Sequence, residues 1–187
     1  PHMAELIFIN VHKQFQEHDP ISGPLQRGIH EYTHVYQLSI GVMPTWMMEG
    51  GALFIENWIP SLDGLGDIKF VMKHVMQNAR RRTGNTGFSI EDMEEIEFAS
   101  NEVAEYYLEL VYYSGAWATI FIVHESPTQS VSALRDEFYP LVSEIGWEAA
   151  LPRYLGMKTK AEFYEAFGDF MEMPLEEQLV YLDELKL

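Results

Sequence analysis

A histidine pair with the spacing His30-Glu31-Tyr32-Thr33-His34 constrains this 187-residue chain more than any other feature. If the stretch is helical, His30 and His34 lie one turn apart and present their imidazoles on the same face. Two neutral imidazoles at this spacing can bind Zn²⁺, and Glu31 between them can act as a general base towards a metal-bound water. The motif therefore predicts a zinc site on a helix.

The alternative interpretation is an ordinary amphipathic helix whose histidines are solvated. With 7 His and 29 acidic residues, such a motif arises by chance in about 4% of chains of this composition. The flanking residues favour the metal site, because Pro24 suits a first helical turn with Ser22 or Gly23 as cap, and Gly41 suits its end. Helical spacing then gives two faces, an apolar stripe of Leu25, Ile29, Tyr32 and Tyr36 and a second face with Arg27, His30, His34 and Gln37.

A tetrahedral zinc held by two histidines needs a third protein ligand, with the fourth position open for water. Glu49, in the stretch WMMEGGA, is the best candidate, because a single acidic residue within an apolar stretch is poorly explained as a surface charge. A buried carboxylate needs a partner, and a cation would serve. Glu56, two turns further on, is either a rival ligand or a hydrogen-bonding partner of a ligand, and we favour Glu49.

The pair Gly50-Gly51 follows Glu49 directly within the same predicted helix. Glycine inside a helix costs about 1 kcal/mol relative to alanine. The pair therefore predicts a close backbone approach to another element.

The composition excludes several classes of protein. With 47% hydrophobic and 13% aromatic residues, the chain fits one globular domain. It has no cysteine, which excludes disulfides and thiolate zinc sites, and its net charge of −17 argues against binding to nucleic acid or anionic membranes. The longest uncharged apolar run, residues 110–123, is too short and too rich in Tyr, Ser and Gly to cross a bilayer, so we expect a buried helix and no transmembrane segment.

Hydrophobic periodicity predicts a mostly α-helical (α+β) chain with a short strand or small sheet at its start. Residues 1–3 resemble an expression-tag remnant, which leaves residues 4–187 as a single domain, expected to be a fragment of a longer protein. Residues 4–11 (AELIFINV) are expected to form the strand, and residues 12–23 a loop. We expect helices over residues 24–41, 45–58, 67–82, 101–124, 130–145, 147–155, 160–171 and 175–187, with Thr45 as a cap and 60–66 as a loop.

Two motifs of the chain resemble those of a known family of enzymes. HEYTH followed by W-x-x-E-G-G-A resembles the gluzincin metallopeptidases, in which H-E-x-x-H precedes a helix with a glutamate ligand. The stretch WMMEGGALFIE is similar to that helix in the zinc aminopeptidases and bacterial collagenases, and most of all in the bacterial peptidase-MA-like family. The resemblance covers most of residues 22–172. It implies a zincin-like catalytic domain, with His30, His34 and Glu49 as zinc ligands and Glu31 as base.

The stretch Tyr112-Tyr113-Ser114-Gly115-Ala116 is similar to the Y-x-x-G-A pattern that carries the catalytic tyrosine of the aminopeptidases. The resemblance implies Tyr112 as an oxyanion donor. Helical spacing agrees, because it places Tyr112 with Gly115 on a small-residue face and Tyr113 on a face with core residues. The alternative is that both tyrosines are core residues with satisfied hydroxyls.

The chain departs from the pattern in several places. The interval between His34 and Glu49 is shorter than in the aminopeptidases, their lysine in the tyrosine motif is Ser114 here, and Leu53 replaces the aspartate of thermolysin. Their G-x-M-E-N exopeptidase motif is not present, so nothing favours amino-terminal trimming over internal cleavage.

The motifs together predict a zinc-dependent metallopeptidase that acts on a peptide or protein substrate. We expect the peptide to lie along an edge strand such as residues 4–11. A non-peptidase zinc hydrolase, or a binding or scaffolding module with a vestigial metal site, are the alternatives. From the resemblance we also expect a bacterial, exported protein.

Overall fold

The computed structural model describes residues 23–187, with the side chain of Phe98 excepted. This part of the chain is α-helical, which confirms the prediction of a mostly helical fold. The strand predicted at residues 4–11 lies outside the described residues, as does the peptide-binding edge assigned to it. Between residues 23 and 187, the β-type pairing is an isolated parallel bridge between Ser130 and Lys186.

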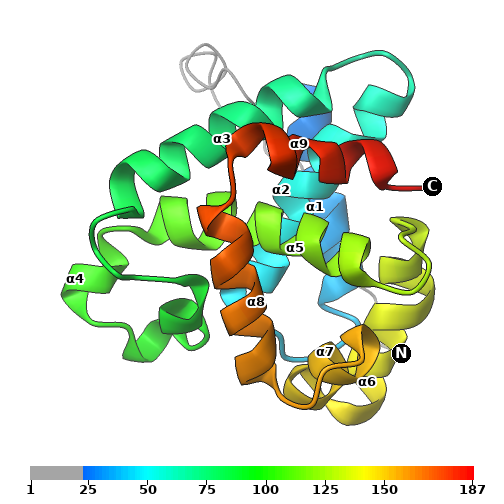
Figure 1. Cartoon of the computed structure of the whole chain (residues 1–187). Coiled ribbons are helices and arrows are strands. Elements are labelled where there is room, and N and C mark those ends of the chain that lie inside the picture. The colour runs from blue at the N-terminus through cyan, green and yellow to red at the C-terminus, as the bar shows by residue number, and fades with distance from the viewer. Residues whose placement is uncertain (1–22) are drawn as a thin grey trace.

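The helices pack as a bundle in which α5 crosses the middle and the other helices surround it (Figure 1). Their bounds are α1 Pro24–Gln37, α2 Thr45–Leu62, α3 Ile68–Thr83, α4 Asn101–Ala104, α5 Gly115–Glu125, α6 Tyr139–Ile145, α7 Trp147–Leu155, α8 Lys160–Glu172 and α9 Leu175–Glu184. Two π-helical segments lead into α5 and α6, namely η4 Leu108–Ser114 and η5 Leu134–Phe138. Two short 3₁₀ turns, η2 Ile90–Met93 and η3 Ile96–Phe98, lie between α3 and α4.

Three predicted boundaries were wrong. Pro44 and not Thr45 is the N-cap of α2, because its extended backbone breaks the preceding turn. The same helix continues through Pro60 to Leu62, since a proline in the last turn removes only one hydrogen bond of the helix. The single helix predicted over 101–124 is divided into α4, η4 and α5.

The crossing of α2 and α5 is the centre of the fold, and it depends on two glycines. A Cβ atom added to Gly50 would lie against the backbone of Gly115, and one added to Gly115 would lie 2.5 Å from the carbonyl oxygen of Trp46. The two helices therefore touch backbone to backbone. This confirms the close approach predicted from the glycine pair.

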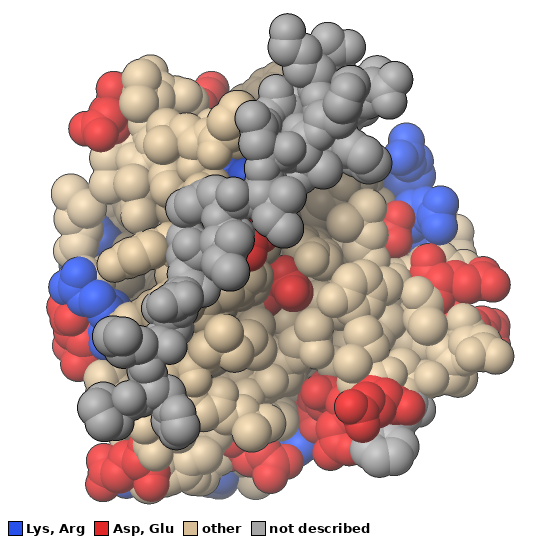
Figure 2. Space-filling model, turned by 180° about the vertical axis from the view of Figure 1, so that it is seen from behind, with Lys and Arg blue, Asp and Glu red and all other residues tan. Residues whose placement is uncertain are grey.

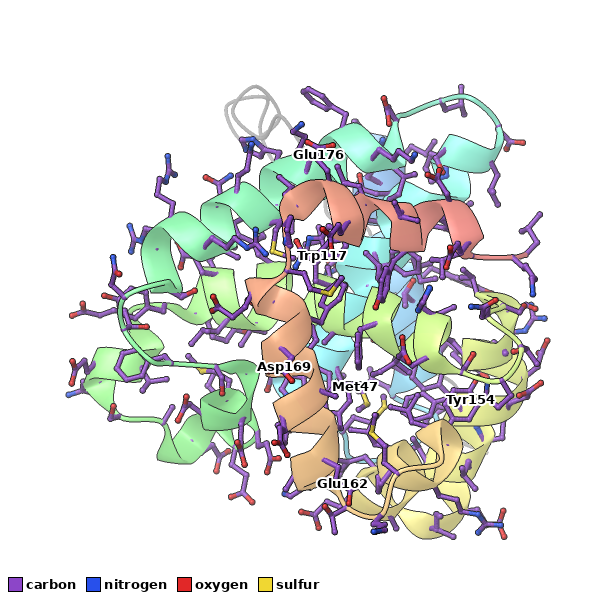
Figure 3. All side chains as sticks on the ribbon, viewed as in Figure 1. Met47, Trp117, Tyr154, Glu162, Asp169 and Glu176 are labelled. Carbon is purple, nitrogen blue, oxygen red and sulfur yellow. The ribbon has the colours of Figure 1, made fainter. Side chains whose placement is uncertain are left out.

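The main core surrounds this crossing. Figure 3 shows Met47 of α2 and Trp117 of α5 inside the bundle, while Glu162 lies at its margin. The indole of Trp117 is fully buried and its Nε1 donates to the carbonyl of Met72 at 3.2 Å, which joins α5 to α3. Apolar side chains of α7, α8 and α9 complete this core.

A second, smaller cluster lies beside the main core, and we call it the side cluster. Its buried members are Met93, Val103, Leu110 and Val111, and the partly buried Phe88, Ala99, Tyr106, Tyr107 and Tyr112 pack against them. Tyr112 also packs against the main core, so it lies where the two clusters meet.

The surface carries most of the acidic side chains. In Figure 2 they lie mainly around the margin of the face shown, and a smaller group is visible near its centre. Between Gly23 and Leu187, no helix has both the length and the apolar character needed to cross a membrane.

Candidate metal centre

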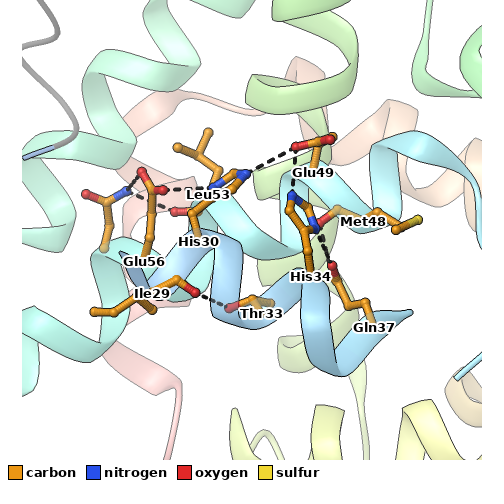
Figure 4. Close-up of polar contacts among 10 residues, drawn as sticks. Ile29, His30, Thr33, His34, Gln37, Met48, Glu49, Leu53 and Glu56 are labelled. Atoms are coloured by element: carbon orange, nitrogen blue, oxygen red, sulfur yellow. Dashed lines mark hydrogen bonds and ion pairs between the residues drawn. The ribbon is translucent and has the colours of Figure 1, made fainter. Parts of the chain in front are cut away.

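The two histidines of the motif come from α1 and face the same point. Their rings lie 4.7 Å apart between centroids, at 84° to each other. The Nε2 atoms of His30 and His34 each lie 3.2 Å from the same oxygen, Oε2 of Glu49 (Figure 4). Helical spacing explains the first relation, because residues i and i+4 project from one face.

The third group comes from α2, which lies across α1. His30, His34 and Glu49 can each offer one ligand atom, and these atoms lie within 4.8 Å of one another. Two imidazole nitrogens and one carboxylate oxygen are a donor set that suits zinc, and three protein ligands leave one position for water. The structure thus brings together the three residues predicted as ligands.

The other ring nitrogens have partners of their own. Nδ1 of His30 lies 2.8 Å from Oε2 of Glu56, and Nδ1 of His34 lies 2.8 Å from Oε1 of Gln37. Both partners can accept a hydrogen bond, so each Nδ1 can donate to its own partner while each Nε2 faces the shared oxygen of Glu49. Metal-binding histidines are usually oriented by hydrogen bonds of this kind.

Glu56 is therefore placed as a partner of His30 and not as a ligand. Its side chain is only 2% exposed, and its second oxygen accepts a hydrogen bond from Nδ2 of Asn57 at 3.3 Å. The preference for Glu49 over Glu56 agrees with this arrangement.

Gln37 is the site residue whose role the sequence analysis missed. Its side chain is fully buried, and besides accepting from His34 it donates to the carbonyl of Met48 at 3.0 Å and to the hydroxyl of Tyr139 at 3.4 Å. The sequence feature that could have indicated this role was the position of Gln37, three residues after His34 and on the ligand face. A polar residue there can reach back to the ring of the histidine.

The charges of the centre are matched to a cation. Burial opposes ionisation of Glu49, but hydrogen bonds from His30 and His34 hold its pKa well below the usual range. Burial also lowers the pKa of His30, and the hydrogen bonds and charges of Glu49 and Glu56 more than offset it, raising this pKa to about 9. The pKa of His34 is raised for the same kind of reason. The two carboxylates thus favour positive charge at this position.

Tyr112 lies against the histidine pair. Its ring is stacked on that of His30, with centroids 6.2 Å apart and planes at 13°. Burial, followed by the charge of Glu49, raises the pKa of Tyr112, so its hydroxyl keeps its proton and can act as a donor. Tyr113 is half-buried and packs against the main core.

Glu31 is exposed and is not one of the three grouped ligands. Its charge contributes to the raised pKa of Tyr112. An exposed carboxylate next to His30 is free to exchange protons with water or with a substrate.

Comparison of the chain with protein-family models, with curated proteins and with solved structures gives no significant match. The likeness to gluzincins therefore depends on the motifs alone, and the function has to be argued from the geometry of the centre.

Proposed function

We propose that this protein is a zinc-dependent metallopeptidase of gluzincin type. The observation that carries the proposal is the convergence of His30 and His34 on one oxygen of Glu49, each at 3.2 Å. Each Nδ1 faces an acceptor, so both Nε2 atoms can bind a metal once they are deprotonated.

When bound at this centre, zinc would supply a Lewis acid and lower the pKa of a water molecule towards neutrality. The role of Glu31 is to accept the proton of the attacking water and to pass it to the leaving amine. Its exposure and its position directly after His30 suit this transfer.

Tyr112 would stabilise the charge that develops on the carbonyl oxygen of the substrate. Its hydroxyl stays protonated because burial and the charge of Glu49 raise its pKa. A fixed donor of this kind is worth more inside a partly dehydrated site than in water.

The motif resemblance favours peptide bonds as the substrate and makes a non-peptidase zinc hydrolase the second candidate. We extend the proposal to a bacterial protein that is exported, with which the absence of cysteine and the net charge of −17 are compatible.

Metal analysis combined with proteolysis tests the proposal. We expect about one zinc per chain, lost in His30→Ala and in His34→Ala. Glu31→Gln should keep its zinc while turnover of a quenched peptide library falls by about 10²–10⁴-fold, because the base is removed and the ligands are not. Glu102→Gln, which removes an exposed carboxylate from α4, is the control and should behave as wild type.

Full activity of zinc-free wild-type protein would refute the proposal. If the zinc-loaded protein leaves every peptide intact and cleaves small esters or amides, the second candidate replaces the first.

A further inference from the structure

A second tyrosine lies next to the proposed oxyanion donor. Tyr107, in the turn between α4 and η4, is half-buried in the side cluster. Its ring lies 5.8 Å from that of Tyr112, with the planes at 70°, an edge-to-face contact. Tyr112 is in turn stacked on His30. The three rings form a row that runs from the side cluster to the metal centre.

The π-helical segment explains why these two tyrosines meet. In an α-helix, residues five apart point about 140° away from each other. In a π-helix the hydrogen bonds run from i to i+5, so residues five apart complete a single turn. Tyr107 directly precedes η4 and Tyr112 lies within it, so the wide turn brings both rings to the same side. Segments of this kind are frequent at functional sites.

We propose that Tyr107 is a positioning residue whose ring holds the ring of Tyr112 in place against His30. Its effect on catalysis depends on the proposed peptidase function, whereas its effect on the row of rings does not. The ring of Tyr112 is then held by two contacts, the edge-to-face contact with Tyr107 and the stacking on His30. Its hydroxyl therefore keeps one direction.

Three variants separate the ring of Tyr107 from its hydroxyl and from the stability of the side cluster. Tyr107→Phe keeps the edge-to-face contact, and Tyr107→Leu keeps apolar bulk without an aromatic ring. Tyr106→Leu is the matched control, because Tyr106 belongs to the same cluster but packs against Phe88 and under Arg82.

The first measurement is steady-state kinetics on zinc-loaded protein. We expect Tyr107→Leu to lower kcat by about 10- to 100-fold with little change in KM or zinc content, because a small displacement of a catalytic group has effects of this size. Tyr107→Phe and Tyr106→Leu should stay within a few-fold of wild type. If Tyr107→Phe loses as much kcat as Tyr107→Leu, the hydroxyl acts directly and the proposal is wrong.

The second measurement needs no activity. The imidazole proton signals of His30, recorded by NMR on isotope-labelled protein, depend on the ring current of the stacked Tyr112. In Tyr107→Leu these signals should move towards their positions in Tyr112→Leu, and in Tyr107→Phe and Tyr106→Leu they should not. Unmoved signals in Tyr107→Leu would overturn the proposal. If they move as expected while no peptide is cleaved even by wild type, the row of rings stands and the proposed function fails.

Discussion

The two helices that form the metal centre differ in how they are held. Of the 14 residues of α1, Gln37 is the buried one, whereas 11 of the 18 residues of α2 are buried. Helix α2 is fixed by the main core and by its backbone contact with α5. Helix α1, the outer helix, is less buried, although its Tyr36 packs against the main core, and its histidines and Gln37 bond to α2.

This difference matters because both helices contribute to the candidate centre. The buried helix supplies Glu49 and Glu56, and the outer helix supplies His30 and His34. In the proposed function the outer helix also supplies the base, Glu31, which is exposed. The bonds from the histidines and Gln37 join α1 to α2. Four substitutions would break or sharpen this comparison.

The largest effect is expected at the ligand supplied by the buried helix. Glu49→Ala should weaken zinc binding by about 10³-fold, since a zinc site of about 10–16 kcal/mol shared among three protein ligands loses one of them. Glu56→Ala should cost about 10–100-fold, because it only orients His30. Competition with a chromogenic chelator measures both affinities. The reverse ranking would make Glu56 the ligand.

The next effect concerns the hydroxyl of Tyr112, whose ring is stacked on His30 of the outer helix. Tyr112→Phe should lower kcat by about 10²–10³-fold, the cost of removing one oxyanion donor. Zinc content and thermal unfolding should not change. Tyr113→Phe is the matched control, and we expect it to stay within a few-fold of wild type. A near-normal kcat in Tyr112→Phe would remove it from the proposed mechanism and turn attention to Tyr113.

A smaller effect tests whether the buried helix is the fixed one. Gly50→Ala places a Cβ against the backbone of Gly115. The free energy of unfolding should fall by about 2–3 kcal/mol, because overpacking outweighs the higher helix propensity of alanine. On the outer helix, Tyr32→Ala removes a side chain that is 69% exposed and should change stability by less than about 0.5 kcal/mol. Denaturant titrations compare them, and equal stabilities would contradict the difference between the helices.

The smallest effect is expected at the residue that links the two helices. Gln37→Leu keeps the bulk but removes the acceptor for His34 and the donor to Met48. We expect about tenfold weaker zinc binding, at the lower end for a residue that orients a ligand. Ser39→Ala, which removes only a bond to the carbonyl of Tyr36 just after the end of α1, is the control. Unchanged affinity in Gln37→Leu would show that the orientation of His34 does not depend on this bond.

The grouping of His30, His34 and Glu49 could be predicted because each residue has a local signature. His30 and His34 need only one helix to meet, and Glu49 was marked by a lone charge within an apolar stretch. The glycine pair likewise indicated a close contact before its partner Gly115 was known. These features depend on spacing along the chain, which the sequence states directly.

The remaining features depend on contacts between distant segments. Gln37 contacts Tyr139, which lies 102 residues later in the sequence. No local sequence pattern indicates that contact or the burial of Gln37. The segment η4 also escaped prediction, because a π-helical turn shifts the period on which helical faces are assigned. Tyr112 was therefore assigned with α-helical spacing, whereas its contact with Tyr107 comes from the wider turn.

The donor set of the centre also has a consequence for which ions compete for it. Two imidazole nitrogens bind the hard cations Mg²⁺ and Ca²⁺ much more weakly than the later transition metals, and a single carboxylate does not reverse this preference. Within the transition series, Cu²⁺ binds such nitrogen ligands more strongly than Zn²⁺. The three residues thus discriminate well against the abundant alkaline-earth ions and poorly against copper. The supply of metal during synthesis would then decide which ion the protein holds.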